Sequence, residues 1–133
     1  MTQIDTHNTN NPKLIYPELS YQLVGVLYKA DNLLGYGHSE KKICEAITAI
    51  LKEENISFSE QVPLLIQITR DKKIKYIADY IIDNKIVLEI KVGSKFQKGN
   101  FMQLLSYLKS SNYKLGIISV FTPQGVKYKR IVY

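Results

Sequence analysis

The sequence predicts a single α/β domain, with a mixed β-sheet of about five strands flanked by helices. Apolar residues recur at helical spacing in the first part of the chain, and they alternate with polar residues from Phe58 onward. The length of 133 residues fits one domain, and a hydrophobic content of 45% is sufficient for a buried core. The expected element order is αα-βββ-α-ββ, in which the helices pack against the sheet.

A disordered lead-in is expected at the N-terminus. Residues 1–13 are rich in Thr and Asn and lack the apolar stretch of a secretory signal, so the folded domain is expected over residues 14–133. The first helix is predicted over residues 17–34. Pro17 suits its first turn, where a missing N–H costs nothing, and Gly35 suits the position after a helix.

A second helix is predicted over residues 39–54. Its apolar residues recur at helical spacing and form one stripe. Cys44 lies on that stripe and is interpreted as a small buried hydrophobe. The only acid on the stripe is Glu40, at its N-terminal end.

Strands dominate the second half of the chain. Three are expected over residues 62–68, 73–82 and 85–92, with turns at Asp71-Lys72 and Asp83-Asn84. The apolar run near the C-terminus predicts a strand buried inside the sheet. The remaining elements are a helix over residues 98–110 and strands over residues 115–121 and 126–132.

Charge and cysteine content limit the function classes. There are 18 basic and 12 acidic residues, so the net charge is +6 and the partner is expected to be anionic, such as nucleic acid. The single cysteine excludes an intramolecular disulfide and fits a reducing compartment, which indicates the cytoplasm. No apolar run approaches the roughly 20 residues that span a membrane, so no membrane association is expected.

Three charged side chains interrupt the predicted strands. Side chains alternate between faces along a strand, so Asp79 is expected to share a face with Ile77 and Ile81, and Glu89 to share one with Lys91. The two carboxylates thus occupy positions where the pattern asks for apolar residues. Buried carboxylates placed together are costly unless a cation compensates them.

The chemistry of these groups suits a hard divalent ion, Mg²⁺ or Mn²⁺. Such an ion can polarise a phosphodiester, and Lys91 beside it can orient an attacking water or stabilise charge on the phosphate. Spacing alone fits another interpretation equally well. In that interpretation Glu89 and Lys91 lie on a solvated face, and Asp79 pairs with a nearby lysine.

The arrangement of an acid, nine residues and then Glu-x-Lys on adjacent strands resembles the PD-(D/E)XK nuclease superfamily. Asp79 and Glu89-Ile90-Lys91 carry this resemblance, and Ala78 stands in place of the proline. Over about residues 19–132 the chain also resembles the small bacterial GxxExxY family of that superfamily. The matching segments are residues 33–40, 61–64, 78–79, 87–91 and 103–108.

The GxxExxY pattern carries over position by position, with one departure. Gly37 and Glu40 match its glycine and glutamate, but Ile43 occupies the position of its tyrosine. Gln103 and Tyr107 match a Gln-x-x-x-Tyr motif that follows the core in the exonuclease-type branch. Being four residues apart, they share a helix face, and the resemblance implies that they bind substrate or brace the catalytic lysine.

The resemblance implies a restriction-endonuclease-like core and a nuclease that uses Mg²⁺ or Mn²⁺ to hydrolyse phosphodiester bonds in DNA or RNA, leaving a 5′-phosphate. Asp79, Glu89 and the main-chain carbonyl of Ile90 would hold the metal, and Lys91 would serve the attacking water. Glu40 has two interpretations: a further metal ligand of the catalytic set, or an acid in a first helical turn that favours the helix dipole.

Two alternatives belong to other function classes. The first is a catalytically inactive protein that keeps the nuclease fold and acts as a nucleic-acid-binding or accessory module. The small size and Ile43 in the tyrosine position permit it. The second is a homo-oligomer whose basic face binds another protein, with the acids serving only in salt bridges.

Overall fold

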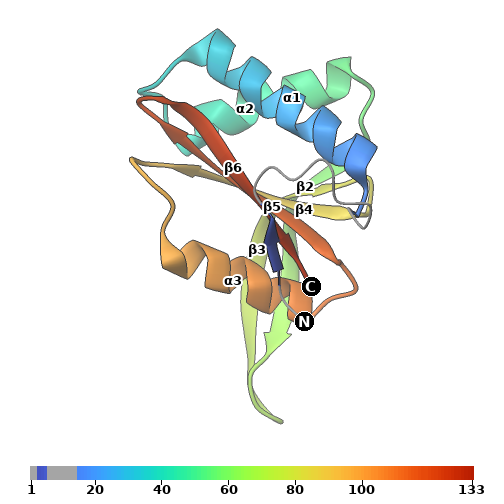
Figure 1. Cartoon of the computed structure of the whole chain (residues 1–133). Coiled ribbons are helices and arrows are strands. Elements are labelled where there is room, and N and C mark those ends of the chain that lie inside the picture. Colours follow the sequence, from blue (N-terminus) through green and yellow to red (C-terminus); the bar gives the residue numbers. More distant parts are fainter. Residues whose placement is uncertain (1–2, 6–14) are drawn as a thin grey trace.

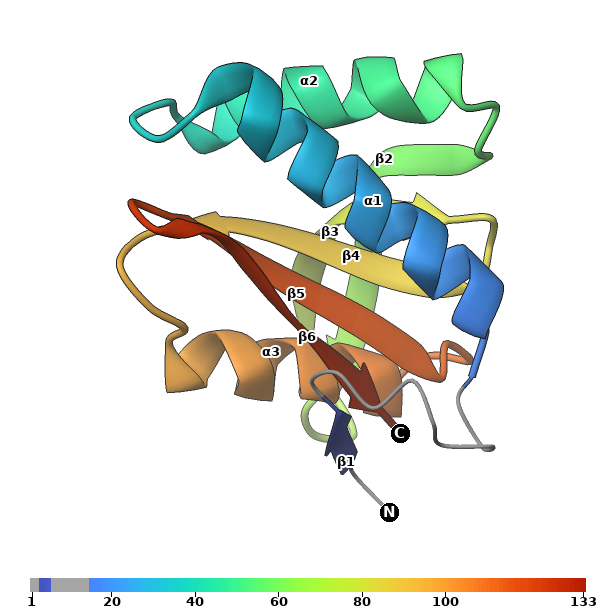
Figure 2. The ribbon, with the colours of Figure 1, turned by 45° about the horizontal axis from the view of Figure 1, so that its top comes forward.

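The computed structural model describes residues 3–5 and 15–133. Its centre is a six-stranded sheet in the order β1-β6-β5-β4-β3-β2, with helices on both faces (Figures 1 and 2). The elements are β1 (Gln3–Asp5), α1 (Pro17–Leu34), α2 (Glu40–Glu53), β2 (Phe58–Gln67), β3 (Lys73–Ile82), β4 (Ile86–Val92), α3 (Lys98–Lys109), β5 (Leu115–Thr122) and β6 (Gly125–Val132).

The sheet separates two hydrophobic cores. Helices α1 and α2 lie on one face and α3 lies on the other (Figure 2). Strands β4 and β5 are parallel and central, α3 connects them, and every residue of β5 is buried. The predicted order αα-βββ-α-ββ and the mixed sheet are therefore confirmed. Within the described part of the chain, no helix has both the length and the apolarity needed to cross a membrane.

Local chemistry sets the ends of the two N-terminal helices. Pro17 is the first residue of α1, and the N–H of Gly35 after its end donates to the carbonyl of Asp31 at 2.8 Å. Gly35 has a φ of 71°, the left-handed region in which glycine carries no penalty. Ser39 caps α2 by accepting the N–H of Lys42 at 3.2 Å.

Two expectations differ from the structure. The sheet has a sixth strand, because β1 pairs with β6 within the segment that was expected to be a disordered lead-in; residues 1–2 and 6–14 of that segment lie outside the described residues. Strand β2 begins at Phe58, four residues before its predicted start. Pro63 lies inside β2, where its missing N–H is tolerated because β2 is an edge strand that, among the described strands, pairs with β3 alone.

The sheet forks where β3 leaves β4. These two strands pair only over residues 80–82, whereas β2 and β3 stay paired out to Gln67 and Lys73. The turn joining β3 to β4 has two left-handed residues, Asp83 (φ 49°) and Asn84 (φ 53°), as a type I′ turn requires. It brings the start of β4 back along β3 for three pairs before the strands diverge.

The paired strands β2 and β3 also twist at the fork. Tyr80 packs in the α1–α2 core, but Tyr76 and Ala78 pack in the α3 core although alternation would place all three on one face. The prediction that Ile77 shares a face with Ile81 was therefore wrong: Ile77 is 46% exposed, and Ile81 is buried under α3. Gln61, the β2 residue at this point, has a left-handed φ of 50°.

Candidate active site at the fork of the sheet

Asp79 occupies the point where the main-chain ladder between β3 and β4 ends. Its Oδ2 accepts a hydrogen bond from the N–H of Ile90 at 2.8 Å. Beyond this point β3 no longer offers a main-chain carbonyl to β4. The side-chain oxygen of Asp79 accepts the N–H of Ile90 instead, so this buried donor remains paired. The bond also fixes the Asp79 carboxylate against β4, next to Glu89.

Glu89 is a buried carboxylate, only 3% exposed. The hydroxyl of Tyr76 donates to its Oε1 at 2.6 Å. Burial, followed by the charge of Asp79, raises the pKa of Glu89 to about 8, although the Tyr76 hydrogen bond and Lys91 act in the opposite direction. At neutral pH and without a cation, Glu89 therefore carries a proton for much of the time.

Three tyrosines support Glu89 from the side of α3. The ring of Tyr76 meets that of Tyr107 edge-on, with centroids 4.8 Å apart, and Tyr107 in turn stacks on Tyr113 at 6.3 Å. Tyr107 is fully buried. Its ring packs against Tyr76, the residue that holds Glu89, so the structure shows Tyr107 inside the core. A role of Tyr107 in binding substrate or in bracing Lys91 stays a prediction.

Tyr76 is the residue that sequence reasoning missed. No motif marks it, and strict alternation along β3 places it on the face opposite Asp79. It reaches the side of Glu89 only because the strand twists between the two residues. The only feature of the sequence that could have indicated Tyr76 is that it is the one aromatic residue in the lysine-rich first half of β3.

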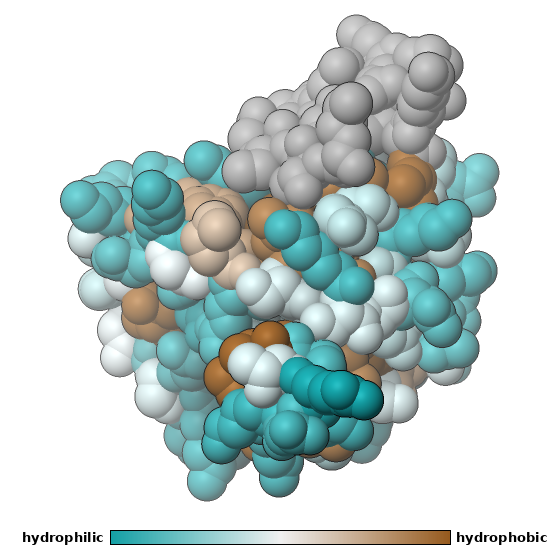
Figure 3. All heavy atoms as spheres, turned by 90° about the horizontal axis from the view of Figure 1, so that it is seen from below, coloured by the Kyte–Doolittle hydropathy of each residue, from teal (hydrophilic) through white to brown (hydrophobic). Residues whose placement is uncertain are grey.

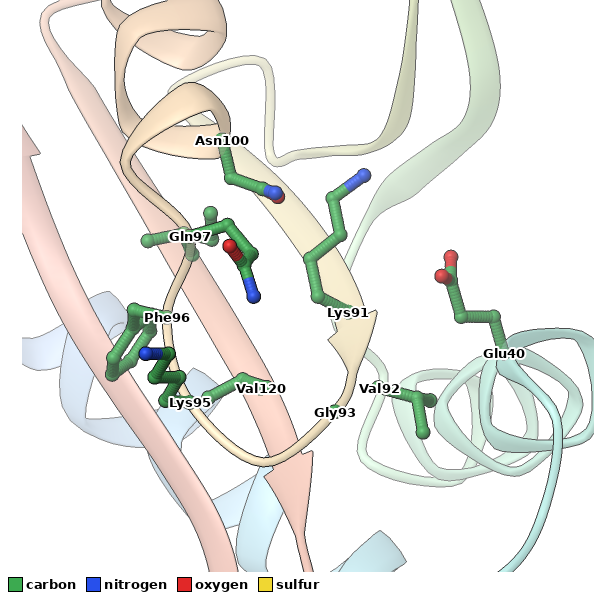
Figure 4. A pocket seen from close by; sticks show the side chains of 10 residues that line it. Glu40, Lys91, Val92, Gly93, Lys95, Phe96, Gln97, Asn100 and Val120 are labelled. Carbon is green, nitrogen blue, oxygen red and sulfur yellow. The ribbon is translucent and has the colours of Figure 1, made fainter.

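Lys91 and Glu40 line one cleft, and neither Asp79 nor Glu89 is among its lining residues. Its volume is about 250 Å³, and the other lining residues are Val92, Gly93, Lys95, Phe96, Gln97, Asn100, Ile118 and Val120. In Figure 4, Lys91 from β4 lies between Glu40 of α2 on one side and Gln97 and Asn100 at the start of α3 on the other. Helix α2 thus brings Glu40, which is distant in sequence, to the same cleft as Lys91.

Gln103 and Tyr107 do not share an environment, although both lie on α3. Gln103 is exposed and is not among the residues that line the cleft, whereas Tyr107 is buried. A contact between Gln103 and a long substrate remains a prediction.

The oxygen donors at the fork fit a hard divalent cation. The carboxylate of Asp79 lies close enough for its charge to raise the pKa of Glu89, so a cation beside the pair would relieve both burial and repulsion. Within the described residues, no three His, Cys, Asp or Glu side chains converge as a ready metal cluster. The structure thus brings Asp79 and Glu89 together, while Glu40 shares the cleft with Lys91.

Comparison with protein families gives a match over residues 17–131, to the PD-(D/E)XK nuclease superfamily. The chain belongs to this superfamily. Among solved structures, the crystal structure of SSO0001 is similar to this chain, with a TM-score of 0.57 and 26% sequence identity. The similarity covers 88% of this chain and 59% of that one, so this PD-(D/E)XK chain spans little more than half of that relative. Comparison with curated proteins gave no match.

Proposed function

We propose that this member of the PD-(D/E)XK superfamily is a nuclease that hydrolyses phosphodiester bonds in DNA or RNA with the help of Mg²⁺ or Mn²⁺. The observation that carries the proposal is the meeting of Asp79 and Glu89 at the fork, with Lys91 on the same strand two residues further along. Superfamily membership supports a nuclease-like function and a nucleic-acid partner.

Each residue has a distinct role in the proposal. Asp79, Glu89 and the carbonyl of Ile90 would hold the ion, and Glu40 would add a ligand from across the cleft when substrate is bound. When bound, the ion supplies positive charge that stabilises the phosphate in the transition state. Lys91 faces the cleft, where its ammonium group can orient the attacking water or stabilise negative charge on the phosphate. The product would carry a 5′-phosphate.

The narrower resemblance to the GxxExxY family is part of the proposal. Ile43, in the position of the family tyrosine, is 2% exposed and packs in the α1–α2 core. A tyrosine there would bury a hydroxyl that needs a partner, whereas isoleucine needs none. We therefore expect the departure to change core packing and to leave the carboxylates and Lys91 in place. A bacterial, cytoplasmic origin belongs to the same proposal.

The test combines metal binding with cleavage. Calorimetry with Mg²⁺ and Mn²⁺ is expected to show binding by the wild type and none by Asp79→Ala/Glu89→Ala, with circular dichroism confirming that both are folded. Cleavage of labelled DNA and RNA should require the metal and disappear in Asp79→Ala and Lys91→Ala. Undiminished cleavage by Asp79→Ala would remove this mechanism. Tight binding of nucleic acid with no cleavage under either ion would favour the accessory module instead.

A further inference from the structure

A ribbon of two strands projects from the sheet beyond the fork. From the pair Val62–Ala78 to the pair Gln67–Lys73, β2 and β3 pair only with each other among the described strands. The ribbon extends past α3 to a tip at residues 68–72 (Figure 1). At about 3.3 Å per residue, its paired part alone is about 17 Å long.

Hydrogen bonds hold the tip of the ribbon in one conformation. The side-chain amide of Gln67 donates to the carbonyl of Thr69 at 2.5 Å, and the N–H of Ile68 donates to the carbonyl of Lys72 at 2.9 Å. One side of the ribbon is braced where Leu64 and Ile66 pack partly against the α3 core. The projection is therefore preorganised, which lowers the entropy cost of binding a partner.

The exposed surface of the ribbon is both basic and apolar. Between residues 65 and 77 four basic side chains accompany one acid, Asp71, and none of the four forms an ion pair with a described residue. Leu65 is 58% exposed and Ile77 is 46% exposed. Figure 3 looks onto this end of the molecule and shows hydrophilic side chains beside apolar ones. The basic residues are Arg70, Lys72, Lys73 and Lys75.

We infer that this ribbon enters the major groove of duplex DNA that reaches the active site. The inference rests on the proposed function and names its substrate class. A two-stranded ribbon fits the major groove, which is about 12 Å wide and about 8.5 Å deep. Lys73 and Lys75 would contact phosphates along the groove, and Leu65 and Ile77 would contact thymine methyl groups. Asp79 follows Ile77 by two residues on β3, so a duplex held by the ribbon would pass close to the proposed active site.

Other occupants fit the ribbon less well. The major groove of double-stranded RNA is deep and narrow, so the side chains of the ribbon cannot reach its bases. A second copy of this chain would bring two sets of exposed lysines and arginines together, and their repulsion opposes pairing through the tip. Charge complementarity therefore favours DNA over a second copy.

The experiment measures binding separately from cleavage. Fluorescence anisotropy would use the Asp79→Asn protein with a labelled mixed-sequence DNA duplex of about two helical turns (about 20 base pairs), the same sequence as duplex RNA, and the single DNA strand. The DNA duplex is expected to bind at least about tenfold more tightly than either. Adding Lys73→Ala/Lys75→Ala should weaken DNA binding about tenfold or more and reduce the salt slope by about two.

The matched control removes two exposed lysines elsewhere. Lys52→Ala/Lys114→Ala lowers the net charge equally and is expected to keep nearly the full affinity and slope. Equal losses in the two double variants, or equal affinity for duplex RNA, would overturn the role of the ribbon while metal-dependent cleavage still supported the proposed function. Sedimentation that showed a dimer, abolished by Leu65→Lys, would assign the surface to a second copy. Failure to bind all three nucleic acids would remove the proposed function as well.

Discussion

The buried carboxylate of Glu89 makes folding depend on pH at the scale of one residue. Burial and then the charge of Asp79 raise its pKa to about 8, well above the ordinary value of a glutamate. The folded state therefore binds a proton that the unfolded state has lost between about pH 4.5 and pH 8. The contribution of Glu89 to stability is complete below that window and declines as the pH rises through it.

We accordingly expect Glu89→Gln to be more stable than the wild type at pH 8 without metal, by about 2–4 kcal/mol, and similar to it near pH 4. Glutamine keeps an oxygen for the Tyr76 hydroxyl but has no charge to bury. Urea denaturation in the presence of a chelator measures the difference. Glu53→Gln, at an exposed position of α2, is the control and should change stability little at either pH. A wild type whose stability does not fall over this window would contradict the raised pKa.

Tyr76 is expected to act as a positioning residue for Glu89. Tyr76→Phe removes the 2.6 Å hydrogen bond while leaving the ring, so divalent-metal affinity should fall about tenfold to a hundredfold. Calorimetry with Mn²⁺ measures this loss. Tyr107→Phe is the matched control, because its buried hydroxyl has no hydrogen-bond partner among the residues described, and it should leave metal affinity unchanged. Equal effects of both variants would indicate a packing role alone.

Cys44 is expected to be unreactive in the folded protein. Burial, followed by the charge of Asp79, raises the pKa of its thiol to about 12, so little thiolate exists at neutral pH. Reaction with a chromogenic disulfide reagent at pH 8 should be slower by at least about a hundredfold than in denaturant. A rate close to that of the unfolded chain would show that the thiol is accessible and ionised.

At the scale of elements, the contact between α3 and β5 depends on the absence of a side chain. A Cβ added to Gly116 would lie 2.8 Å from Cδ2 of Leu104, which is fully buried on α3. Gly116→Ala is therefore expected to destabilise the protein by about 1–3 kcal/mol. In Gly116→Ala/Leu104→Ala the two losses should be less than additive, since the second change makes room for the first.

A second glycine provides the control for this prediction. Gly99 lies in the first turn of α3, and nothing lies within 4 Å of the position that a Cβ would occupy. Gly99→Ala should therefore stabilise the protein by up to about 1 kcal/mol through helix propensity. Chemical denaturation of both variants measures the change in the free energy of unfolding. Opposite signs at the two positions would show that the space around the new Cβ decides the outcome.

The elements themselves follow largely from the sequence. Pro17, the glycine after α1 and the apolar stripes predict the limits of the first two helices, because caps and periodicity are local properties. Strand β1 could not be predicted, since three residues of ordinary composition pair with β6 only through tertiary contacts. The early start of β2 had the same cause: its first residues are held by β3, whose C-terminal half they face.

The candidate site was predictable in part for a related reason. Asp79, Glu89 and Lys91 stand out because charged groups interrupt apolar strands. Tyr76 and the burial of Tyr107 depend on a twist at Asp79 and on the depth at which α3 packs, and neither leaves a periodic signal. Charged residues that interrupt an apolar strand can be recognised in a sequence. Residues that support them only through tertiary packing cannot.

At the scale of the whole molecule, metal binding should stabilise the fold in a way that depends on pH. The ion competes with the proton on Glu89, so its apparent affinity should rise up to about tenfold per pH unit below pH 8 and level off above it. In thermal denaturation, the increase in melting temperature with Mg²⁺ should thus be larger at pH 8 than at pH 6. Asp79→Asn should show no increase at either pH, and an equal increase in that variant would place the metal elsewhere.

Because the N–H of Ile90 donates to the side chain of Asp79, this one backbone proton reports on the state of the candidate active site. Most protected amides in a sheet report on the strand beside them, but this one is sheltered by a side chain. Its exchange with deuterated solvent and its nitrogen chemical shift will follow any event that draws the carboxylate away. The Ile90 resonance in an ¹⁵N spectrum should thus report whether a cation is bound at Asp79, even if the rest of the sheet does not change.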